Sequence, residues 1–345
     1  MKRIMMVATA LTLATVLTSQ TVDAEETKRK AHSLSQLIDQ DYGKKINIKE
    51  KSFYEFDSTK KGVYFTNNED AKDRLLEYNR QTHKLRTIYT TKVKDDSLIK
   101  DVSANEKWVT WVDTGDEVEE TSVIYAMNTA THQVKLLTPK AQRKNYKHDL
   151  VLSGHYIAYQ TYNQHAHQFE VILQDLISQK RKVIMASKDY RSQLRVQDGK
   201  LILNVISRHH SKIHVYSINN HQLKTYRLPN VRVHEATMVG KKLLYVATTT
   251  SDTTETQRVM LYNPQSKSVV KFPKKMNMIS SIVVGPKNQV YLQRNHGFYT
   301  PFAISASGQI SEKTPLMAEQ LKIHNRLYVY RKASASGSLT VMTKR

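Results

Sequence analysis

The sequence predicts an all-β fold, a β-propeller of seven four-stranded blades, on three observations. Short apolar runs rich in Val, Ile, Tyr and Trp recur along the chain and are separated by polar turns. The second run of each unit is apolar on both faces, as expected for a strand covered by neighbouring blades. Two turns recur at matching positions of the units. Because one such sheet cannot bury both its faces alone, copies are expected to pack on either side of it.

The repeat is clearest between residues 98 and 138, where four β-rich runs follow one another. An apolar second strand marks each unit, and seven such strands are present. They begin at Val63, Trp108, Tyr156, Leu201, Leu243, Val290 and Leu327. Their separations of 37 to 48 residues are in the range of a four-stranded blade. This spacing predicts seven blades, with six as the alternative.

Two turns support the same alignment. Gly or Asn precedes each apolar strand, and both residue types accept a left-handed backbone at low cost. These residues are Gly62, Asn105, Gly154, Gly199, Gly240, Gly285 and Asn325. The turn after the third strand opens with Asn79, Asn128, Asp175 or Asn263, whose side chains can accept backbone hydrogen bonds. His83, His132 and His221 fall where this turn needs a positive φ, so we interpret them as turn residues rather than metal ligands.

The two ends of the propeller complement each other. The last unit has three strands, over residues 321–324, 327–331 and 339–343, and then the chain ends. Residues 45–49 alternate between polar and apolar, as an outer edge strand does, and belong to no other unit. We therefore expect this N-terminal strand to pair with the last one and close the ring, which would remove an exposed edge.

The units resemble the secreted or periplasmic TolB-type and WD40-like propellers over about residues 44–345. The shared frame is a polar turn, an apolar strand with aromatic residues, a strand that ends in Asn or Asp, and a small-residue turn. The Ser-Pro-Asp-Gly turn of these proteins is partial here, as Gln197-Asp-Gly199 and Ser153-Gly154. His, Gln or Lys replaces the Gly usual in the later turn. TolB-type propellers have six blades, so the resemblance implies the fold and not the function.

The N-terminus predicts secretion. Residues 1–24 combine a basic Lys2-Arg3 start, an apolar run over residues 4–17 and small residues up to Ala24, the layout of a cleavable signal peptide. The apolar run is shorter than the ~20 residues that span a bilayer, so we expect no transmembrane segment in the mature chain. Residues 25–43 are expected to form a short helical or flexible segment, and residues 44–345 the propeller.

Composition narrows the class of partner. Lys and Arg total 53 against 31 Asp and Glu, which gives a formal charge of +22 and favours anionic partners. For an extracellular protein, we expect the partner to be an anionic polysaccharide or an acidic protein rather than nucleic acid. We expect the protein itself to be a monomer. Cysteine is absent, which excludes disulfides, thiol nucleophiles and Cys-based zinc sites.

The expected binding face carries the loops between second and third strands together with the blade-to-blade connections. It should be acidic over the first two units and cationic over the third, fourth, sixth and seventh. Its candidate anion-binding residues are Arg143, Lys144, Tyr146, His165, His167, Arg208, His209, His210, Arg294, His296, Tyr299 and Arg331. A generally basic surface without a single site is the alternative.

No motif predicts catalysis. His165, His167, His209 and His210 match no standard metal-ligand spacing, so we expect no metal and no cofactor. The acidic run from Asp113 to Glu120 lacks the spacing of a calcium loop and is interpreted as a solvated loop. Nucleophile elbows, zinc-protease motifs and phosphate loops are absent. The sequence therefore favours a secreted, non-catalytic binding or scaffold propeller, with an extracellular lyase or hydrolase acting on an acidic polysaccharide as the alternative.

Overall fold

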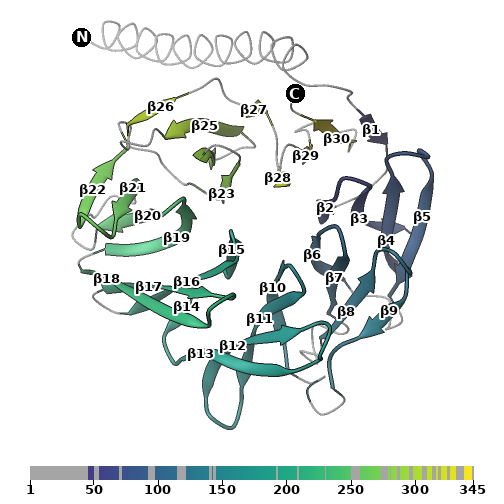
Figure 1. Cartoon of the computed structure of the whole chain (residues 1–345), viewed down its shortest axis with the longest axis horizontal. Helices are drawn as coiled ribbons and strands as arrows, with labels where there is room; N and C mark the ends of the chain where they lie inside the picture. Colours follow the sequence, from purple (N-terminus) through teal and green to yellow (C-terminus); the bar gives the residue numbers. More distant parts are fainter. Residues whose placement is uncertain are drawn as a thin grey trace, which may run out of the picture.

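The chain forms a ring of antiparallel sheets around a central axis (Figure 1). The computed structural model describes residues 46–49, 54–69, 72–91, 98–114, 122–139, 142, 145–191, 193–207, 210–229, 231–249, 257–272, 279, 281–285, 288–294, 298–304, 309–312, 316–317, 320–324, 327–331 and 338–343. These residues form seven sheets. The fold is a seven-bladed β-propeller, as predicted. The expected signal peptide and the segment 25–43 lie outside the described residues.

The first three blades each contain four strands in chain order. Blade 1 contains β2 (Phe56–Ser58), β3 (Gly62–Glu69), β4 (Lys72–Asn79) and β5 (Leu85–Thr90). Blade 2 contains β6 (Ile99–Ala104), β7 (Trp108–Asp113), β8 (Val123–Asn128) and β9 (Val134–Leu136). Blade 3 contains β10 (Lys147–Ser153), β11 (Tyr156–Asn163), β12 (Gln168–Asp175) and β13 (Arg181–Ser187).

Blades 4 to 6 keep the same four positions, although two of these positions are divided between two short strands. Blade 4 contains β14 (Tyr190–Arg191), β15 (Arg195–Gln197), β16 (Lys200–Ser207), β17 (His210–Ser217) and β18 (Gln222–Pro229). Blade 5 contains β19 (Val231–Val239), β20 (Lys242–Thr249), β21 (Arg258–Asn263) and β22 (Ser268–Lys271). Blade 6 contains β23 (Ser281–Val284), β24 (Gln289–Arg294), β25 (Phe298–Ile304), β26 (Ile310–Glu312) and β27 (Leu316–Met317).

Blade 7 combines the two ends of the described chain. It contains β28 (Gln320–His324), β29 (Leu327–Arg331), β30 (Ser338–Thr343) and, from the N-terminal side, β1 (Ile46–Lys49). β1 pairs antiparallel with β30, with Ile46 opposite Val341 and Lys49 opposite Ser338. An N-terminal strand therefore lies at the outer position of this blade. That this pairing holds the ring closed stays a prediction.

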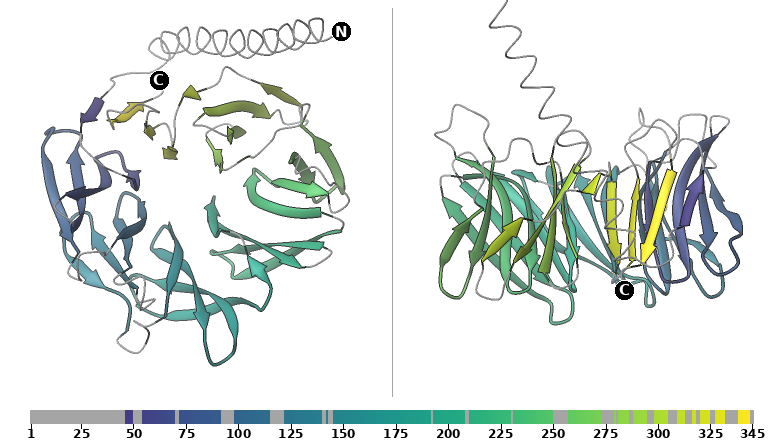
Figure 2. Two further views of the ribbon diagram at one scale, coloured as in Figure 1. Left: turned by 180° about the vertical axis from the view of Figure 1, so that it is seen from behind. Right: turned by 90° about the horizontal axis from the view of Figure 1, so that it is seen from above.

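The first strand of each blade is the innermost one. Along the ring, β2 contacts β6, β6 contacts β10, β10 contacts β15, β15 contacts β19, β19 contacts β23, β23 contacts β28, and β28 contacts β2. Figure 2 shows the ring from behind and edge-on, with the strands running across the thickness of a disc. One end of every blade therefore lies on one face of the disc, and the other end lies on the opposite face.

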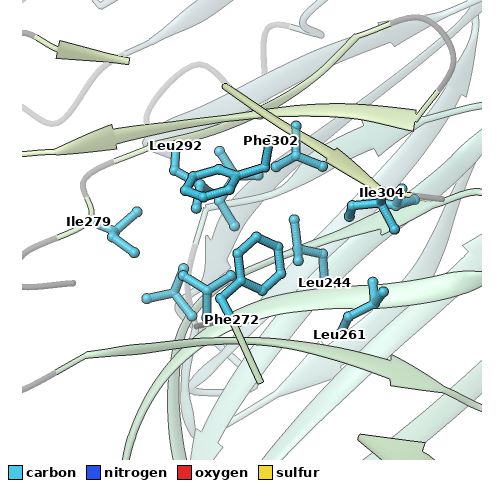
Figure 3. Packing of buried hydrophobic residues seen from close by; sticks show 12 residues of the cluster. Leu244, Leu261, Phe272, Ile279, Leu292, Phe302 and Ile304 are labelled. Carbon is cyan, nitrogen blue, oxygen red and sulfur yellow. The ribbon is translucent and has the colours of Figure 1, made fainter. Parts of the chain in front are cut away.

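The core consists of seven apolar clusters, one between each pair of neighbouring blades. Between blades 5 and 6, the rings of Phe272 and Phe302 meet edge to face with centroids 5.2 Å apart (Figure 3). Between blades 7 and 1, Val329 and Val341 pack against Phe65. Both faces of a blade are thus buried, which is the physical reason for the doubly apolar second strands.

The turns between third and fourth strands have the predicted geometry. Asn79 Oδ1 accepts hydrogen bonds from the backbone N–H groups of Gln81 and Thr82, both at 2.9 Å, and Asn128 does the same for Ala130 and Thr131. The positive-φ position is occupied in five blades, by His83, His132, Gln179, His221 and Lys267, with φ between 53° and 60°. The interpretation of these histidines as turn residues is confirmed.

The turns between first and second strands follow the prediction only in part. Gly154, Gly199 and Gly240 have a positive φ, but Gly62, Asn105 and Gly285 do not. At Asn105, the side-chain Oδ1 accepts hydrogen bonds from the N–H groups of Lys107 and Trp108, both at 3.0 Å, and so shapes the turn without a left-handed residue. Asn325 lies outside the described residues.

Removal of residues 25–51 from the mature chain should lower its stability, because it deletes β1 and leaves β30 as an exposed edge. We expect the melting temperature to fall by at least about 5 °C in differential scanning calorimetry. A matched variant that lacks only residues 25–43 should melt like the mature chain. Equal melting of all three proteins would contradict the role of β1.

Candidate functional site

A cavity lies on the propeller axis. It has a volume of about 520 Å³ and is lined by the inner strands of all seven blades. Four carboxylates line it, from Glu55, Asp57, Asp101 and Asp149, together with the cations Arg195 and Lys322. The cavity therefore carries more acidic than basic side chains, although the protein as a whole is strongly basic.

Three of these carboxylates connect consecutive blades. Asp57 Oδ2 in blade 1 accepts a hydrogen bond of 2.7 Å from Ala104 N in blade 2. Asp101 Oδ2 in blade 2 accepts one of 3.1 Å from Leu150 N in blade 3. Asp149 Oδ2 in blade 3 lies 3.4 Å from Leu194 N in blade 4. These three residues form what we call the carboxylate belt. Its contacts stabilise the packing of neighbouring inner strands.

Two members of the belt occupy a rare backbone conformation. Asp101 and Asp149 both have φ of 55°, a value that Asp tolerates better than most residues. In both inner strands the pairing register shifts next to the aspartate, between Lys100 and Ser103 and between His148 and Val151. Such an irregularity redirects a side chain out of the sheet. The bulge thus allows each aspartate to reach across to the following blade.

Arg195 continues the connection through blades 4, 5 and 6. Its guanidinium forms an ion pair with Glu235 in blade 5 and donates a hydrogen bond of 2.8 Å to the carbonyl oxygen of Ile282 in blade 6. Burial raises the pKa of Glu235, and the charge of Arg195 opposes this rise. One half-buried arginine therefore holds three blades together at the cavity wall.

Glu55 is a buried carboxyl group of the cavity with a strongly raised pKa. Burial raises its pKa to about 7, and the charge of Lys322 acts in the opposite direction. Burial also raises the pKa of Asp101. A carboxyl group with such a pKa can exchange a proton at neutral pH, as a general acid or base must. No group of three or more His, Asp or Glu side chains suited to a metal occurs among the described residues.

Glu55→Gln should change how stability depends on pH. Because the folded-state pKa of Glu55 is raised, its stabilising effect is complete below the unfolded value of about 4.5 and is lost as pH rises through 7. The variant should match the native protein near pH 4.5 and exceed its unfolding free energy by about 1–3 kcal/mol at pH 8. Urea unfolding at both pH values measures this, with the exposed-site variant Glu106→Gln as control. If the unfolding free energies of the variant and the native protein differ by the same amount at pH 4.5 and pH 8, the raised pKa of Glu55 is contradicted.

The described candidate anion ligands lie at the ends of their strands, on the face that carries the loops between second and third strands. We call this the loop face. Tyr146 precedes β10 and stacks on His148, with ring centroids 5.8 Å apart. His165 and His167 are exposed in the β11–β12 turn, and His210 begins β17. Tyr146, His165 and His167 belong to blade 3 and its entry, whereas His210 belongs to blade 4.

Of the remaining candidate anion-binding residues, three are described by their backbone positions and five lie outside the described residues. Arg294 ends β24, Tyr299 lies at the start of β25 and Arg331 ends β29, so their backbones also lie at the loop face. Arg143, Lys144, Arg208, His209 and His296 lie outside the described residues. The described candidates are spread over four blades, and their joint action as one site stays a proposal.

Sequence reasoning missed a buried lysine beneath this face. Lys147 is 2% exposed, and its ammonium donates hydrogen bonds to the carbonyl oxygens of Ser122 (2.9 Å), Gln142 and Asn145. Burial lowers the pKa of Lys147 to about 8, and Arg181 contributes to the decrease. Lys147 and Arg181 line a cavity of about 320 Å³ that also contains His165. Its strand, Lys147–Ser153, begins with three polar residues, so the sequence pattern does not indicate this burial.

Lys147→Met should destabilise the protein by about 2–4 kcal/mol, because it leaves three backbone carbonyl groups without their donor. Urea unfolding at pH 7 measures the change. The exposed-site variant Lys180→Met should stay within about 0.5 kcal/mol of the native protein. A Lys147→Met variant as stable as that control would show that the three hydrogen bonds contribute nothing.

The interpretation of Asp113 as part of a solvated loop is wrong. Asp113 and Asp73 are fully buried between blades 1 and 2. Tyr89 donates a hydrogen bond of 2.7 Å to Asp113, and Ile99 N donates one of 2.8 Å to Asp73. Burial raises the pKa of Asp73, and Asp113 adds to the rise. These carboxylates connect neighbouring blades away from the axis, whereas the rest of the acidic run lies outside the described residues.

The comparison with known proteins identifies the fold. The sequence matches no protein-family model and no curated protein. Its solved structural neighbours are β-propellers. The propeller domain of the Trilobed protease from Pyrococcus furiosus, which has an open velcro topology, superposes with a TM-score of 0.62 at 11% identity, over 85% of this chain and 94% of that domain.

Two further neighbours differ in function from that protease. An oligogalacturonate lyase in complex with manganese superposes with a TM-score of 0.52 at 10% identity, over 88% of this chain and 98% of the lyase. TolB from Acinetobacter baumannii gives a TM-score of 0.46 at 12% identity, over 84% of this chain and 79% of TolB. The superpositions on the protease domain and the lyase, with TM-scores of 0.62 and 0.52, show a shared propeller fold. At 11% and 10% identity they leave the function to the residues of this chain.

Proposed function

We propose that this protein is a secreted, non-catalytic binding propeller that recognises an anionic envelope polymer or an acidic protein on its loop face. The observation that carries the proposal is the structural use of the axial carboxylates. Asp57, Asp101 and Asp149 each accept a backbone hydrogen bond from the next blade. Groups that hold the ring together are poorly suited to act as mobile acids, bases or nucleophiles.

The electrostatics of the cavity favour the proposal that an anionic partner binds outside it. Four carboxylates against two cations disfavour the entry of a polyanion. The net charge of +22 must then act from the outer surfaces. On the loop face, the exposed His165 and His167, the ring of Tyr146 and the residues Arg294 and Arg331 supply cationic and aromatic groups for a sugar phosphate, a uronate or an acidic side chain. The sequence adds the cations Arg143, Lys144 and Arg208, which lie outside the described residues.

An extracellular lyase or hydrolase acting on an acidic polysaccharide is the second candidate. Glu55 favours it, because a cavity carboxyl with a pKa of about 7 could transfer a proton at neutral pH. The likeness to an oligogalacturonate lyase is compatible with this candidate at the level of the fold. Catalysis would also require His or Arg side chains of the loop face to converge on the substrate.

The proposal is tested by two fourfold charge reversals of equal net charge. Arg143, Lys144, Arg208 and Arg294 are replaced by Glu in one variant, and Lys60, Lys61, Lys241 and Lys242 on the opposite face in the other. Affinity for soluble polygalacturonate, measured by isothermal titration calorimetry, should fall at least about tenfold more in the first variant. Binding by the native protein should also weaken with salt, because surface charges are screened within about 8 Å at physiological ionic strength.

Equal losses in the two variants would overturn the loop-face site and leave a generally basic surface. Binding that does not respond to salt would overturn the electrostatic mechanism. Shortening of the polymer during the titration would support the lyase or hydrolase instead.

A further inference from the structure

The face opposite the loop face is built from short turns that the structure describes in blades 1 to 5. It consists of the turns between first and second strands, at residues 59–61, 105–107, 154–155, 198–199 and 240–241, and of those between third and fourth strands, at residues 80–84, 129–133, 176–180, 218–221 and 264–267. We call this the turn face. In the edge view of Figure 2, it is the lower margin of the disc, toward which the yellow β30 points.

The turn face is held together by a repeated backbone hydrogen bond between its two kinds of turn. The bonds are Arg80 N to Lys61 O (2.8 Å), Thr129 N to Lys107 O (3.0 Å), Leu176 N to His155 O (2.8 Å) and Ile218 N to Gly199 O (3.0 Å). Neighbouring blades are connected as well, because Lys60 N donates to Glu106 Oε1 at 3.0 Å and Asn105 Nδ2 donates to Gly154 O at 2.8 Å. The turns of blades 1 to 4 are thus each fixed by a backbone hydrogen bond, and those of blades 1 to 3 are linked to one another. We call the turn face as a whole the platform.

The charge on this platform is strongly one-sided. Its turns contain eight cations, Lys60, Lys61, Arg80, Lys84, Lys107, Lys180, Lys241 and Lys267, against two acidic residues, Glu106 and Asp198. Seven of the eight are exposed lysines, and Arg80 is half-buried. They come from four blades on different sides of the ring. A linear polyanion would contact only some of them, whereas a flat anionic surface would meet them all at once.

An apolar side chain also projects from the same platform. Ile177 lies in the β12–β13 turn and is 71% exposed, the most exposed large hydrophobic residue among those described. Its backbone N–H donates a hydrogen bond of 2.8 Å to Asp175 Oδ1, which fixes the turn that presents it. An exposed isoleucine offers neither charge nor a hydrogen bond to a soluble polyanion. At a lipid surface it adds an apolar contact to the electrostatic attraction.

From these observations we propose that the turn face docks on an anionic lipid bilayer, with the lysines near the headgroups and Ile177 in the interface. Lysines near such a surface each contribute attraction that decays within a Debye length. Presentation on hydrogen-bonded turns lets the lysines of several blades bind together with a smaller ordering cost than a flexible segment would incur. The loop face then points away from the membrane, where it is free to meet the partner of the proposed function. The two proposals concern opposite faces and different ligands.

Vesicle co-sedimentation tests the proposal. Vesicles of phosphatidylglycerol and phosphatidylcholine at 1:3 should bind the mature protein in low salt, and pure phosphatidylcholine vesicles should not. Replacing Lys61, Lys107, Lys241 and Lys267 by Gln should weaken this binding by at least about tenfold. The matched control replaces Lys188, Lys212, Arg227 and Lys271 by Gln, which removes the same charge from strand ends near the loop face, and it should bind nearly as the native protein does.

Ile177→Ser separates a membrane from a soluble polymer. It should weaken vesicle binding several-fold and leave the affinity for soluble polygalacturonate unchanged. Unchanged melting temperatures exclude misfolding of the variants. Equal losses of vesicle binding in the two fourfold variants, or no preference for phosphatidylglycerol, would overturn the proposal. Loss of polygalacturonate binding in the turn-face variant, with no effect of Ile177→Ser on vesicles, would instead make this face a polymer site. Failure of the loop-face proposal leaves the vesicle results unaffected.

Discussion

The structure depends on the need to bury both faces of every blade. A four-stranded sheet with apolar residues on both sides is stable only between two similar sheets, and a ring supplies these without leaving a terminal sheet uncovered. Seven apolar clusters, one at each blade interface, meet this requirement. In the cluster between blades 7 and 1, Phe56 and Phe65 from one end of the described chain pack with Val329 and Val341 from the other. Apolar packing between blades 7 and 1 thus brings the two ends of the described chain together, in addition to the pairing of β1 with β30.

At the centre of the ring, seven inner strands present backbone N–H and C=O groups to a shared cavity. Leaving these groups without hydrogen bonds would cost free energy. The carboxylate belt satisfies some of these groups, since Asp57, Asp101 and Asp149 accept hydrogen bonds from the neighbouring inner strands. Arg195 donates to the backbone carbonyl oxygen of Ile282 in blade 6 and forms an ion pair with the side chain of Glu235 in blade 5. The acidic lining of the axis in a basic protein is therefore explained by assembly of the ring. The positive charge is left to the outer surfaces of the disc, where an anionic polymer, protein or lipid can reach it.

The elements predicted well from the sequence are those governed by local rules. The third-to-fourth-strand turn follows from the hydrogen-bonding capacity of Asn79 or Asn128 and from the tolerance of His83 or His132 for a positive φ, all within five residues. The doubly apolar run at Trp108 to Asp113 likewise predicts β7 without knowledge of its neighbours. Such patterns repeat with the blade, so alignment of the units strengthens each assignment.

The features that sequence reasoning missed depend on contacts between blades. Asp101 meets Leu150 across 49 residues, and a lone aspartate in an inner strand does not indicate this partner. Lys147 would be expected at the surface from its type, and only the convergence of three carbonyl groups explains its burial. Asp113 reads as the start of an acidic loop, but Tyr89 of blade 1 covers it. The turn-face lysines were recognised in the sequence as charges, but the shared platform that orients them follows from the assembled ring.

The central functional claim is that this propeller binds an anionic partner without transforming it. The most direct measurement incubates the mature protein with an array of acidic polysaccharides and polyphosphate, and reads retention and chain length from the same samples. The account predicts retention of at least one polyanion that decreases as salt is added, with the chain length of every polymer unchanged. Release of shorter fragments, above all if Glu55→Gln abolishes it, would contradict the account and make the axial cavity a catalytic site.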